Sequence, residues 1–497
     1  MSTQVAASDL ETVIGLEVHV QLETDTKIFC GCSTEPAEEP NARTCPVCLG
    51  LPGALPVLNE AAVEAAVKLA KAIDADVPDR AGFDRKNYFY PDLPKGFQIT
   101  QYEEPICRDG ELSIQVDGDR KAVGITRAHL EEDPGSLQHV GGSIDTADHV
   151  LVDYNRAGVP LVEIVTEPDL RSPAEARTFL AKLEEVLEYL GIFDSGRDGS
   201  LRVDANISLV PAAALDEDGG VPDDVDANRT EVKNISSHRG AEQALAYEVS
   251  RQRNAVQRGR EVAFETRHWD EARGITVSMR QKEAEADYRY FPEADLPPVA
   301  VADWIDRVEI PELPDARRER FRAEYDLGSE AAEKLTASRA VADFFEELAA
   351  DFDPDVAASW VADDLLGELN YRDMDVTAVE DRLDEVRRLV ELAESGEITR
   401  KNAREVVLRT MLDEGVDPET VVEREGLGTA DEDEVAAAVA AAVEENPGAV
   451  QDYHDGEDGA LNFLVGQVMQ ATGGSADPGE VNERLRDYLA DETGADG

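Results

Sequence analysis

Residues 14–22, with the sequence IGLEVHVQL, alternate between apolar and polar side chains. A period of two is that of a β-strand, whose successive side chains lie on opposite faces of a sheet. The apolar positions, from Ile14 to Leu22, predict a face buried in a core, which leaves Glu17, His19 and Gln21 on the other face. A single strand of this kind could be a half-buried edge strand with a wet polar face. Whether the polar face of this strand is functional depends on whether other strands repeat the pattern.

Four further stretches repeat it. The open-face residues that they predict are Arg127, His129 and Glu131 in 124–133 (GITRAHLEED), Glu163 in 160–169, Arg202, Asp204, Asn206 and Ser208 in 199–209 (GSLRVDANISL), and Lys233 and Asn234 in 230–237. Several such strands predict a sheet whose open side is a site. Carboxylates with an imidazole suit Mg²⁺, and nearby cations offset phosphate charge, which indicates phosphoryl transfer. The sequence contains no GxxxxGK[ST], GxGxxG or GxSxG motif to indicate a P-loop, Rossmann or serine-hydrolase site.

Four of the five cysteines form two close pairs, Cys30 with Cys32 and Cys45 with Cys48, separated by 12 residues. Two thiolate pairs joined by a short loop can close a tetrahedral zinc site without an open position, which is typical of a structural site. Disulfides are the alternative, but no export signal indicates an oxidising compartment. Cys107 has no neighbour in sequence and is predicted to be a small buried residue.

A second unusual stretch is 84–96, DRKNYFYPDLPKG. It combines Lys86 and Lys95 with Tyr88, and its two prolines disfavour a helix. We expect a rigid loop that offers cations and stacking surfaces, as a nucleotide or a tRNA end would require. A packed, proline-rich connection is the alternative.

The chain is very acidic, with 107 Asp and Glu against 48 Lys and Arg and a formal net charge of −59. At multimolar salt the Debye length is only about 3 Å, so such a surface stays hydrated without strong self-repulsion. We therefore expect a halophilic cytoplasmic protein, in which RNA contacts remain feasible at short range. No stretch predicts a membrane span or a signal peptide.

At 497 residues the chain is expected to form more than one domain. Residues 172–191 predict a helix, with Ser172 as N-cap and Gly191 as its stop. Strand patterns prevail up to Leu296, and charged, periodic helical patterns follow. We predict an α+β fold with domains at 1–297, including the cysteine loop 30–48, at 298–412, all helical, and at 413–497, a small helical tail.

Long motifs resemble one known family, the B subunits of aspartyl/glutamyl-tRNA(Asn/Gln) amidotransferases. They are IGLEVHVQL, RKNYFYPDLPKG, RAHLEED, VDYNRAGVPLVEIVTEPD, GSLRVDANIS, EVKN, RYFPEADLPP and LVGQVMQATGG, in order along nearly the whole chain. The resemblance implies a cradle-like antiparallel catalytic domain, a helical domain and a tail that binds tRNA. It also implies ATP- and Mg²⁺-dependent phosphorylation of the side-chain carboxylate of Asp or Glu mischarged on tRNA(Asn) or tRNA(Gln). Ammonia from a glutaminase A subunit then displaces phosphate, and a small C subunit holds A and B together.

The resemblance also implies site residues. The metal and catalytic set is Glu17, His19, Glu131 or Glu132, Glu163 and Asp204. The candidates for binding ATP or the aminoacyl end are Lys86, Tyr88, Lys95, Arg202, Asn206, Lys233 and Arg289. The four-cysteine cluster occurs in only part of the family, which suits structural Zn²⁺.

The chain departs from the family in its tail, where acids at 451–463 replace the usual lysines and weaken the case for charge-based tRNA binding. Two other interpretations stay open. The paralogous E subunit of a glutamyl-tRNA amidotransferase shares the cradle but carries a large inserted domain, for which this chain has no room. A non-catalytic, zinc-containing RNA-binding protein would explain the cysteines and the loop 84–96, but not the acid-bearing strands.

Overall fold

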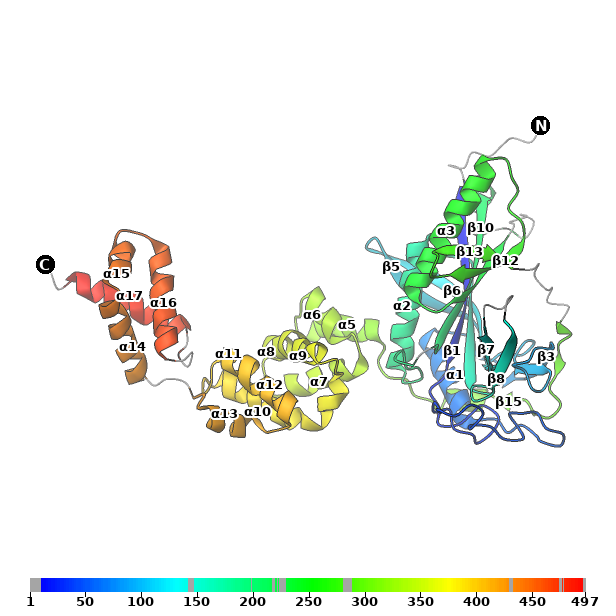
Figure 1. The fold of residues 1–497 in the computed structure, drawn as a ribbon, viewed down its shortest axis with the longest axis horizontal. Helices are drawn as coiled ribbons and strands as arrows, with labels where there is room; N and C mark the ends of the chain where they lie inside the picture. The colour runs from blue at the N-terminus through cyan, green and yellow to red at the C-terminus, as the bar shows by residue number, and fades with distance from the viewer. Residues whose placement is uncertain are drawn as a thin grey trace. The chain divides into compact units, whose positions relative to one another are not determined.

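The structure is a computed structural model. It describes residues 10–494 except 142–146, 198, 217–219, 221, 223–228, 280–287, 429–431, 473–475 and 477. By its internal contacts the chain divides into two compact units, Met1–Ala316 and Arg317–Gly497 (Figure 1). The first unit carries the large sheet, and the second is helical.

The large sheet has eight strands and places β1 near its centre. Its order is β13 (Ile275–Ser278), β12 (Glu265–Asp270), β11 (Thr230–Ile235), β10 (Leu201–Pro211), β1 (Leu10–Gln21), β9 (Pro160–Thr166), β6 (Asp119–Glu132) and β5 (Cys107–Val116). Neighbouring strands are antiparallel except β11 and β12, which are parallel. Helix α3 (His238–Gln257) connects these two strands, because a parallel pair needs a long crossover. The predicted antiparallel sheet is therefore correct except at this one pair.

The alternation predicted for 14–22 is observed in β1. Every second side chain from Ile14 to Leu22 is buried, while Glu17, His19 and Gln21 are half-buried on the opposite face. The buried face joins one hydrophobic core with helices α1 (Glu60–Ala72), α2 (Pro173–Tyr189) and α3. Because these helices share one core with the apolar side of the sheet, the polar side of β1 is left without a helical cover.

Helix α2 follows the predicted signals. The Ser172 hydroxyl accepts a hydrogen bond from the Glu175 backbone N–H at 3.1 Å, and Pro173 occupies the first turn. Gly191, with a φ of +64°, lies just past the end of the helix in the left-handed conformation that glycine adopts without strain. These signals are local, which explains why the sequence alone located the helix.

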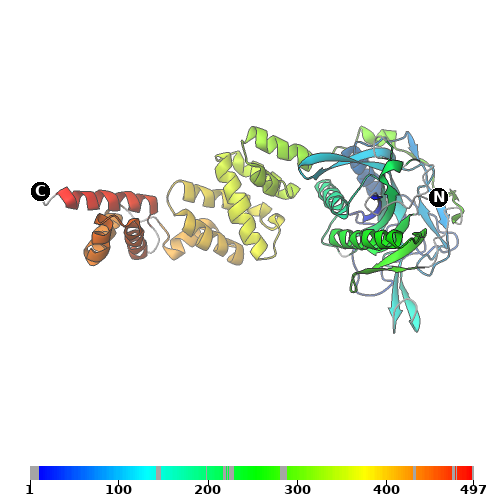
Figure 2. The same cartoon turned by 90° about the horizontal axis from the view of Figure 1, so that it is seen from above.

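Among its described residues, the first unit also contains three smaller sheets. They are β14 (Phe291–Pro292), β3 (Asp84–Asn87) and β4 (Phe97–Thr100); β15 (Val299–Ala300) with β2 (Arg80–Ala81); and the hairpin β7 (Ser136–Val140) with β8 (His149–Asp153). Figure 2 shows the hairpin projecting from the first unit. The stretch 84–96, predicted as a loop throughout, begins with strand β3, so Lys86 lies on a strand and only 88–96 connects β3 to β4. Pairing with β4, a long-range interaction, overrides the local pattern there.

The second unit is helical, as predicted. Its elements are α5 (Pro314–Glu324), which begins in the first unit, α6 (Ser329–Leu335), α7 (Arg339–Ala349), α8 (Pro354–Ser359), η4 (Trp360–Leu365), α9 (Leu366–Tyr371), η5 (Val376–Arg382), α10 (Leu383–Glu394), α11 (Arg400–Asn402), η6 (Ala403–Leu408), α12 (Arg409–Glu414), α13 (Pro418–Glu425), α14 (Glu432–Glu445), α15 (Pro447–His454), α16 (Asp458–Ala471) and α17 (Pro478–Gly494). One core runs from Phe321 to Val421, and another from Val435 to Leu489. Val301 and Val308, flanking α4 (Ala302–Ile305), still belong to the core of the first unit. The boundaries at 297 and 412 stay predictions.

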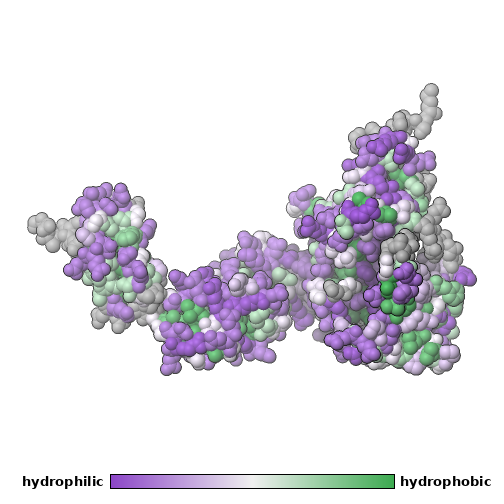
Figure 3. Space-filling model, in the orientation of Figure 1, coloured by the Kyte–Doolittle hydropathy of each residue, from purple (hydrophilic) through white to green (hydrophobic). Residues whose placement is uncertain are grey.

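The molecular surface is largely polar. Figure 3 shows mostly hydrophilic residues on the face in view, with smaller apolar areas between them. In the part of the chain that the structure describes, no helix has both the length and the apolar character needed to cross a membrane.

The core of the first unit generates a stability prediction. Leu183 on α2 is fully buried, so Leu183→Ala should lower the free energy of unfolding by about 2–5 kcal/mol, through lost burial and the cavity left behind. The control is Arg177→Ala on the exposed side of the same helix, where Arg177 pairs with Glu242 at 3.1 Å. That change should cost less than about 1 kcal/mol. Urea denaturation at fixed salt measures both, and equal effects would contradict this packing.

Candidate active site

Strand register brings distant residues into one row on the open face. On β1, His19 lies opposite Glu163 of β9 on one side and opposite Arg202 of β10 on the other. On β6, His129 lies opposite the same Glu163. Directly opposite residues of antiparallel strands share a face, with Cβ atoms about 4.5–5.5 Å apart. Four strands therefore contribute one side chain each to a continuous polar row.

A first cluster, which we call cluster A, consists of His19, Glu131 and Glu163, whose potential ligand atoms all lie within 4.8 Å of one another. The His19 Nε2 atom is 3.4 Å from Glu163 Oε2 and 3.7 Å from Glu131 Oε1. His129 Nε2 is also 3.4 Å from Glu163 Oε2. Two imidazoles thus converge on one carboxylate that is almost removed from solvent.

The electrostatics of cluster A follow from this crowding. Burial lowers the pKa of His19, but the Glu163 and Glu131 carboxylates outweigh it and raise that pKa to about 9. Burial would raise the pKa of Glu163, yet His129 and His19 hold it well below its ordinary value. A protonated His19 therefore balances part of the negative charge of Glu163 and Glu131.

A second cluster, cluster B, consists of Glu17, Asp204 and Glu231, again with ligand atoms within 4.8 Å of one another. Glu17 on β1 lies opposite Asp204 on β10. The Asn206 side-chain amide donates a hydrogen bond to Glu17 Oε1 at 2.9 Å, and Lys233 pairs with Asp204 and, at 3.3 Å, with Glu231. Burial raises the pKa of Glu17, and the Glu163 and Asp204 charges add to that rise. The single metal set expected from the sequence is thus divided into two groups, because register separates Glu17 from His19 by one row.

Sequence reasoning missed Glu231. The signal was present, since Glu231 and Lys233 are two residues apart on β11 and therefore share a face. The sequence analysis placed His129 on the open face but not among the metal ligands, and it did not assign Asp133 to the site. The Asp133 carboxylate accepts hydrogen bonds from Arg202 at 2.7 Å and from the Gln21 amide at 2.8 Å, so it fixes the Arg202 side chain beside cluster A.

The alternatives Glu131 and Glu132 occupy different environments. Glu131 belongs to cluster A. Glu132 instead pairs with Lys95, and its Oε1 atom accepts a hydrogen bond from the Ile99 backbone N–H at 2.8 Å. Glu132 therefore ties the loop 88–96 and strand β4 to the end of β6.

Three further residues predicted to bind ATP or the aminoacyl end, Lys86, Tyr88 and Arg289, lie in different surroundings. Lys86 lies 5.1 Å from the Tyr288 ring centroid, and Tyr88 packs edge-on against the same ring. Burial lowers the pKa of Lys86, but Glu131 and its neighbours raise it well above its ordinary value, so Lys86 stays charged. Arg289 is exposed, and its backbone carbonyl accepts a hydrogen bond from Asn87 at 2.8 Å. The structure therefore brings Lys86 and Tyr88 near cluster A but shows no contact of Arg289 with either cluster.

The four cysteines of the loop 30–48 converge as their spacing predicts. Their sulfur atoms lie within 4.8 Å of one another, and all four thiols are free. The Cys45 backbone N–H donates to Cys48 Sγ at 3.1 Å. Lys27, fully buried, donates to the Arg43 and Tyr154 carbonyls at 2.8 and 3.2 Å and fastens the loop to the domain. Four converging thiols fit tetrahedral Zn²⁺.

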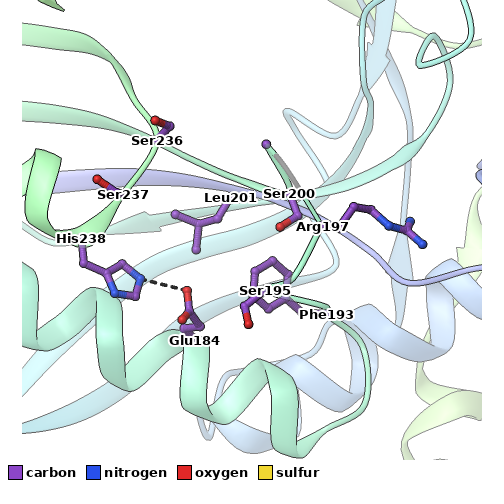
Figure 4. Close-up of a pocket in the computed structure, with 10 residues that line it drawn as sticks. Glu184, Phe193, Ser195, Arg197, Ser200, Leu201, Ser236, Ser237 and His238 are labelled. Carbon is purple, nitrogen blue, oxygen red and sulfur yellow. Dashed lines mark ion pairs between the residues drawn. The ribbon is translucent and has the colours of Figure 1, made fainter. Parts of the chain in front are cut away.

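A separate pocket is lined by none of the predicted site residues. Figure 4 shows it between α2, the start of β10 and the start of α3, where His238 Nε2 lies 3.0 Å from Glu184 Oε2. Its lining residues are Glu184, Phe193, Ser195, Arg197, Gly199, Ser200, Leu201, Ser236, Ser237 and His238. The acid-rich constellation on the open face is thus the better candidate for chemistry.

Comparison with known proteins agrees with this geometry. Residues 12–306 match the family model described as the GatB/GatE catalytic domain, and residues 343–489 match the GatB domain. The chain belongs to the GatB family. The matched catalytic domain contains both clusters and the cysteine loop, and the resemblance noted from the sequence is confirmed.

Curated GatB relatives align over the whole length. Proteins named as the B subunit of aspartyl/glutamyl-tRNA(Asn/Gln) amidotransferase are 70% identical in Haloquadratum walsbyi and 70% identical in Halobacterium salinarum, with 99% of this chain covered and 99% and 100% of theirs. The counterpart in Methanospirillum hungatei is 52% identical over 97% of this chain and 99% of its own. The expected halophilic character agrees with the first two sources.

The cysteine cluster can be tested by elemental analysis. Cys45→Ser should lose bound zinc and lower the thermal midpoint, because removing one of four ligands opens the site. Cys107→Ala is the control, since Cys107 is buried in the main core and distant in sequence from the loop, and it should keep its zinc. Wild-type protein purified with no zinc would refute the assignment.

The different environments of Glu131 and Glu132 predict different effects on metal binding. Glu131→Gln should weaken Mg²⁺ binding to the full chain by about 10-fold or more, because it removes a carboxylate from cluster A. Glu132→Gln should leave Mg²⁺ affinity nearly unchanged and instead loosen the loop 88–96. Isothermal titration with MgCl₂ at constant ionic strength measures the first effect, and hydrogen exchange of 88–96 the second. The reverse order of affinities would contradict the division.

Proposed function

We propose that this chain is the B subunit of an aspartyl/glutamyl-tRNA(Asn/Gln) amidotransferase, and that its open sheet face amidates Asp or Glu attached to tRNA(Asn) or tRNA(Gln). The observation that carries the proposal is the full-length similarity to relatives of that name, at up to 70% identity. The site adds chemical support, because two groups of acids with an imidazole lie side by side on one sheet face. The activity implies the use of ATP.

The reaction has two steps. A side-chain carboxylate oxygen of the tRNA-linked Asp or Glu attacks the γ-phosphorus of ATP, the bond to the bridging oxygen breaks, and ADP leaves. Ammonia then attacks the acyl carbon, inorganic phosphate leaves, and the nitrogen loses a proton to give the amide. Both steps place several negative charges together, so a protein that catalyses them must hold cations where this charge accumulates.

Clusters A and B fit Mg²⁺, since carboxylate oxygens are its preferred ligands. Glu17, Asp204 and Glu231 would hold one ion, and His19, Glu131 and Glu163 another. When bound, the metal supplies charge neutralisation at the phosphates. The protein itself fixes the ligands: Asn206 orients Glu17, Lys233 orients Asp204, and His129 orients Glu163.

The cations near the clusters have two proposed tasks. Lys95, Arg202 and Lys233 are paired with Glu132, Asp133 and Asp204, so they first hold these carboxylates in place. Lys86 and Tyr88 border cluster A and are proposed to contact the nucleotide or the aminoacyl end of tRNA. For Arg289 this role stays a prediction from the family resemblance alone.

The zinc site is proposed to be structural. Four thiols complete a tetrahedral set, which leaves no position for a substrate. The loop is also held within the catalytic domain, because the Asn41 and Arg43 backbone N–H groups donate to the Asp153 and Asn155 side chains at 2.8 and 2.7 Å. Zinc would thus fix a surface beside the catalytic face.

Partners complete the proposal. The sequence shows no motif for glutamine hydrolysis, so a glutaminase A subunit would supply ammonia, and a small C subunit would join A and B. The tail would contact tRNA through short-range interactions, because its acids at 451–463 repel phosphate. This complex is proposed to work in a salt-rich cytoplasm.

The two alternatives lose support. An E subunit would carry a large inserted domain, whereas relatives named as B subunits are covered over 99–100% of their length in the two haloarchaeal cases. A purely RNA-binding protein has no need for two partly buried acid clusters, which cost stability unless they bind something.

The test is ATP-dependent amide formation on mischarged Asp-tRNA(Asn) and Glu-tRNA(Gln), with ammonium as nitrogen donor and the purified full chain. Glu17→Gln and His19→Ala should each reduce phosphorylation of the carboxylate and amide formation together by about 10²-fold or more, because both need the same charge neutralisation. Affinity for tRNA at matched salt should be preserved. Glu11→Gln, an exposed position on the same strand, is the control and should keep full activity.

Two outcomes would count against the proposal. Absence of any ATP-dependent amide from the wild-type chain, alone and with its partner subunits, would remove the function. Normal activity of both variants would leave the function but move the site away from the clusters. Comparing the two mischarged tRNAs in the same assay identifies the substrate that this chain prefers.

A further inference from the structure

We propose that Arg127 binds the phosphate chain of the nucleotide and is a further substrate-binding residue of this site. The proposal rests on the proposed function. It starts from the position of Arg127 on β6, where it lies opposite Val165 of β9, and Val165 in turn lies opposite Glu17 of β1. Arg127 therefore extends the row that contains Glu17 and Asp204 of cluster B.

A β-bulge places Arg127 on this face. The pairing of β6 with β9 shifts between Ile125 and Arg127. Before the shift the buried apolar side chains are Val123 and Ile125, and after it they are Ala128 and Leu130. The extra residue thus reverses the alternation and turns Arg127 to the side of His129 and Glu131. Bulges beside active sites commonly re-aim side chains in this way.

The Arg127 guanidinium lacks a hydrogen-bond acceptor at one of its buried atoms. Its Nε atom is buried without a hydrogen-bond partner. No carboxylate among the described residues lies within ion-pair distance of its guanidinium. Burying a guanidinium N–H without an acceptor is costly, so the arrangement favours an anionic ligand that the free protein does not contain.

Three other arginines of the first unit differ from Arg127 in having a carboxylate partner. Arg85 pairs with Glu293 at 2.6 Å, Arg202 with Asp133 at 2.7 Å, and Arg267 with Glu265 at 2.9 Å. The chain has more than two acids for every base, so carboxylates are plentiful partners for its arginines. Arg127 has none among the described residues, although it lies within the same domain and beside two acid clusters.

The nearby space suits an extended ligand. Val165, the cross-strand neighbour of Arg127, lines a cavity together with Glu17 and Asn206. A phosphate chain that reaches between cluster B and Arg127 would satisfy the guanidinium, whose planar fork matches phosphate oxygens. Lys95, Arg202 and Lys233 are already neutralised by protein carboxylates, so Arg127 adds the charge that these cations do not.

The test compares ATP with adenosine, which lacks the phosphates. Arg127→Gln in the full chain should weaken binding of ATP in the presence of Mg²⁺ by about 10- to 100-fold and leave binding of adenosine unchanged. Arg127→Lys should restore part of the loss, because it returns the charge without the fork. Arg120→Gln, an exposed position on the same strand, is the control and should bind ATP as the wild type does. Calorimetric titration gives the affinities, and thermal midpoints check the fold.

The outcomes separate this inference from the proposed function. Wild-type affinity for ATP in Arg127→Gln overturns the inference, as does an equal loss for ATP and adenosine with a lowered thermal midpoint, which would mean a structural role. With either of these two results, the proposed function still stands if the wild-type protein forms the amide normally. If wild-type protein forms no amide, the proposed function fails, while the contrast between ATP and adenosine still decides the role of Arg127.

Discussion

The antiparallel register of β1 with β9 and β10 is the constraint on which the site depends. It sets His19 against Glu163 and Arg202, and Glu17 against Asp204. A slip of one residue would turn every side chain of β1 to the other face and bury the acids in the core. The five core positions from Ile14 to Leu22 are all fully buried and oppose such a slip. The hydrophobic core thus fixes the catalytic geometry on the opposite side of the same strands.

Gathering acids on one face has an energetic consequence. Burial and mutual repulsion raise the pKa of Glu17, while cluster A relies on a protonated His19 to balance Glu163 and Glu131. Two other carboxylates have a compensating lysine, since Lys233 pairs with Asp204 of cluster B and Lys95 pairs with Glu132 at the end of β6. Such groups persist in a partly buried site only when paired, and bound cations would relieve the same repulsion.

The acidic surface and the acidic site have different causes. The formal charge of −59 is spread over the whole chain and fits a high-salt environment, where screening shortens electrostatic interactions to a few ångströms. Within that range only direct contacts matter. Binding of nucleotides or tRNA must therefore depend on individual cations such as Lys86 and Arg127. A protein with this net charge has no general positive field to attract such anions.

The sequence by itself determined what depends on local pattern. The period-two alternation of β1, the caps of helix α2, the spacing of the four cysteines and the long family motifs predicted the sheet, the scaffold helix, a zinc-type cluster and the family. These features need only neighbours along the chain. Most of the candidate site residues followed from the same patterns, with the family resemblance assigning their roles.

The tertiary structure decided what depends on pairing between distant segments. Register divided the acids into two clusters and added Glu231, because an alternating strand shows which side chains share a face but not which strand lies beside it. The tertiary structure also placed Glu131 beside His19 and Glu132 beside Lys95. The sequence could not distinguish the two, because they are identical and adjacent. The bulge in β6 and the β3–β4 pairing likewise arise from long-range hydrogen bonds, for which one sequence carries no local signal.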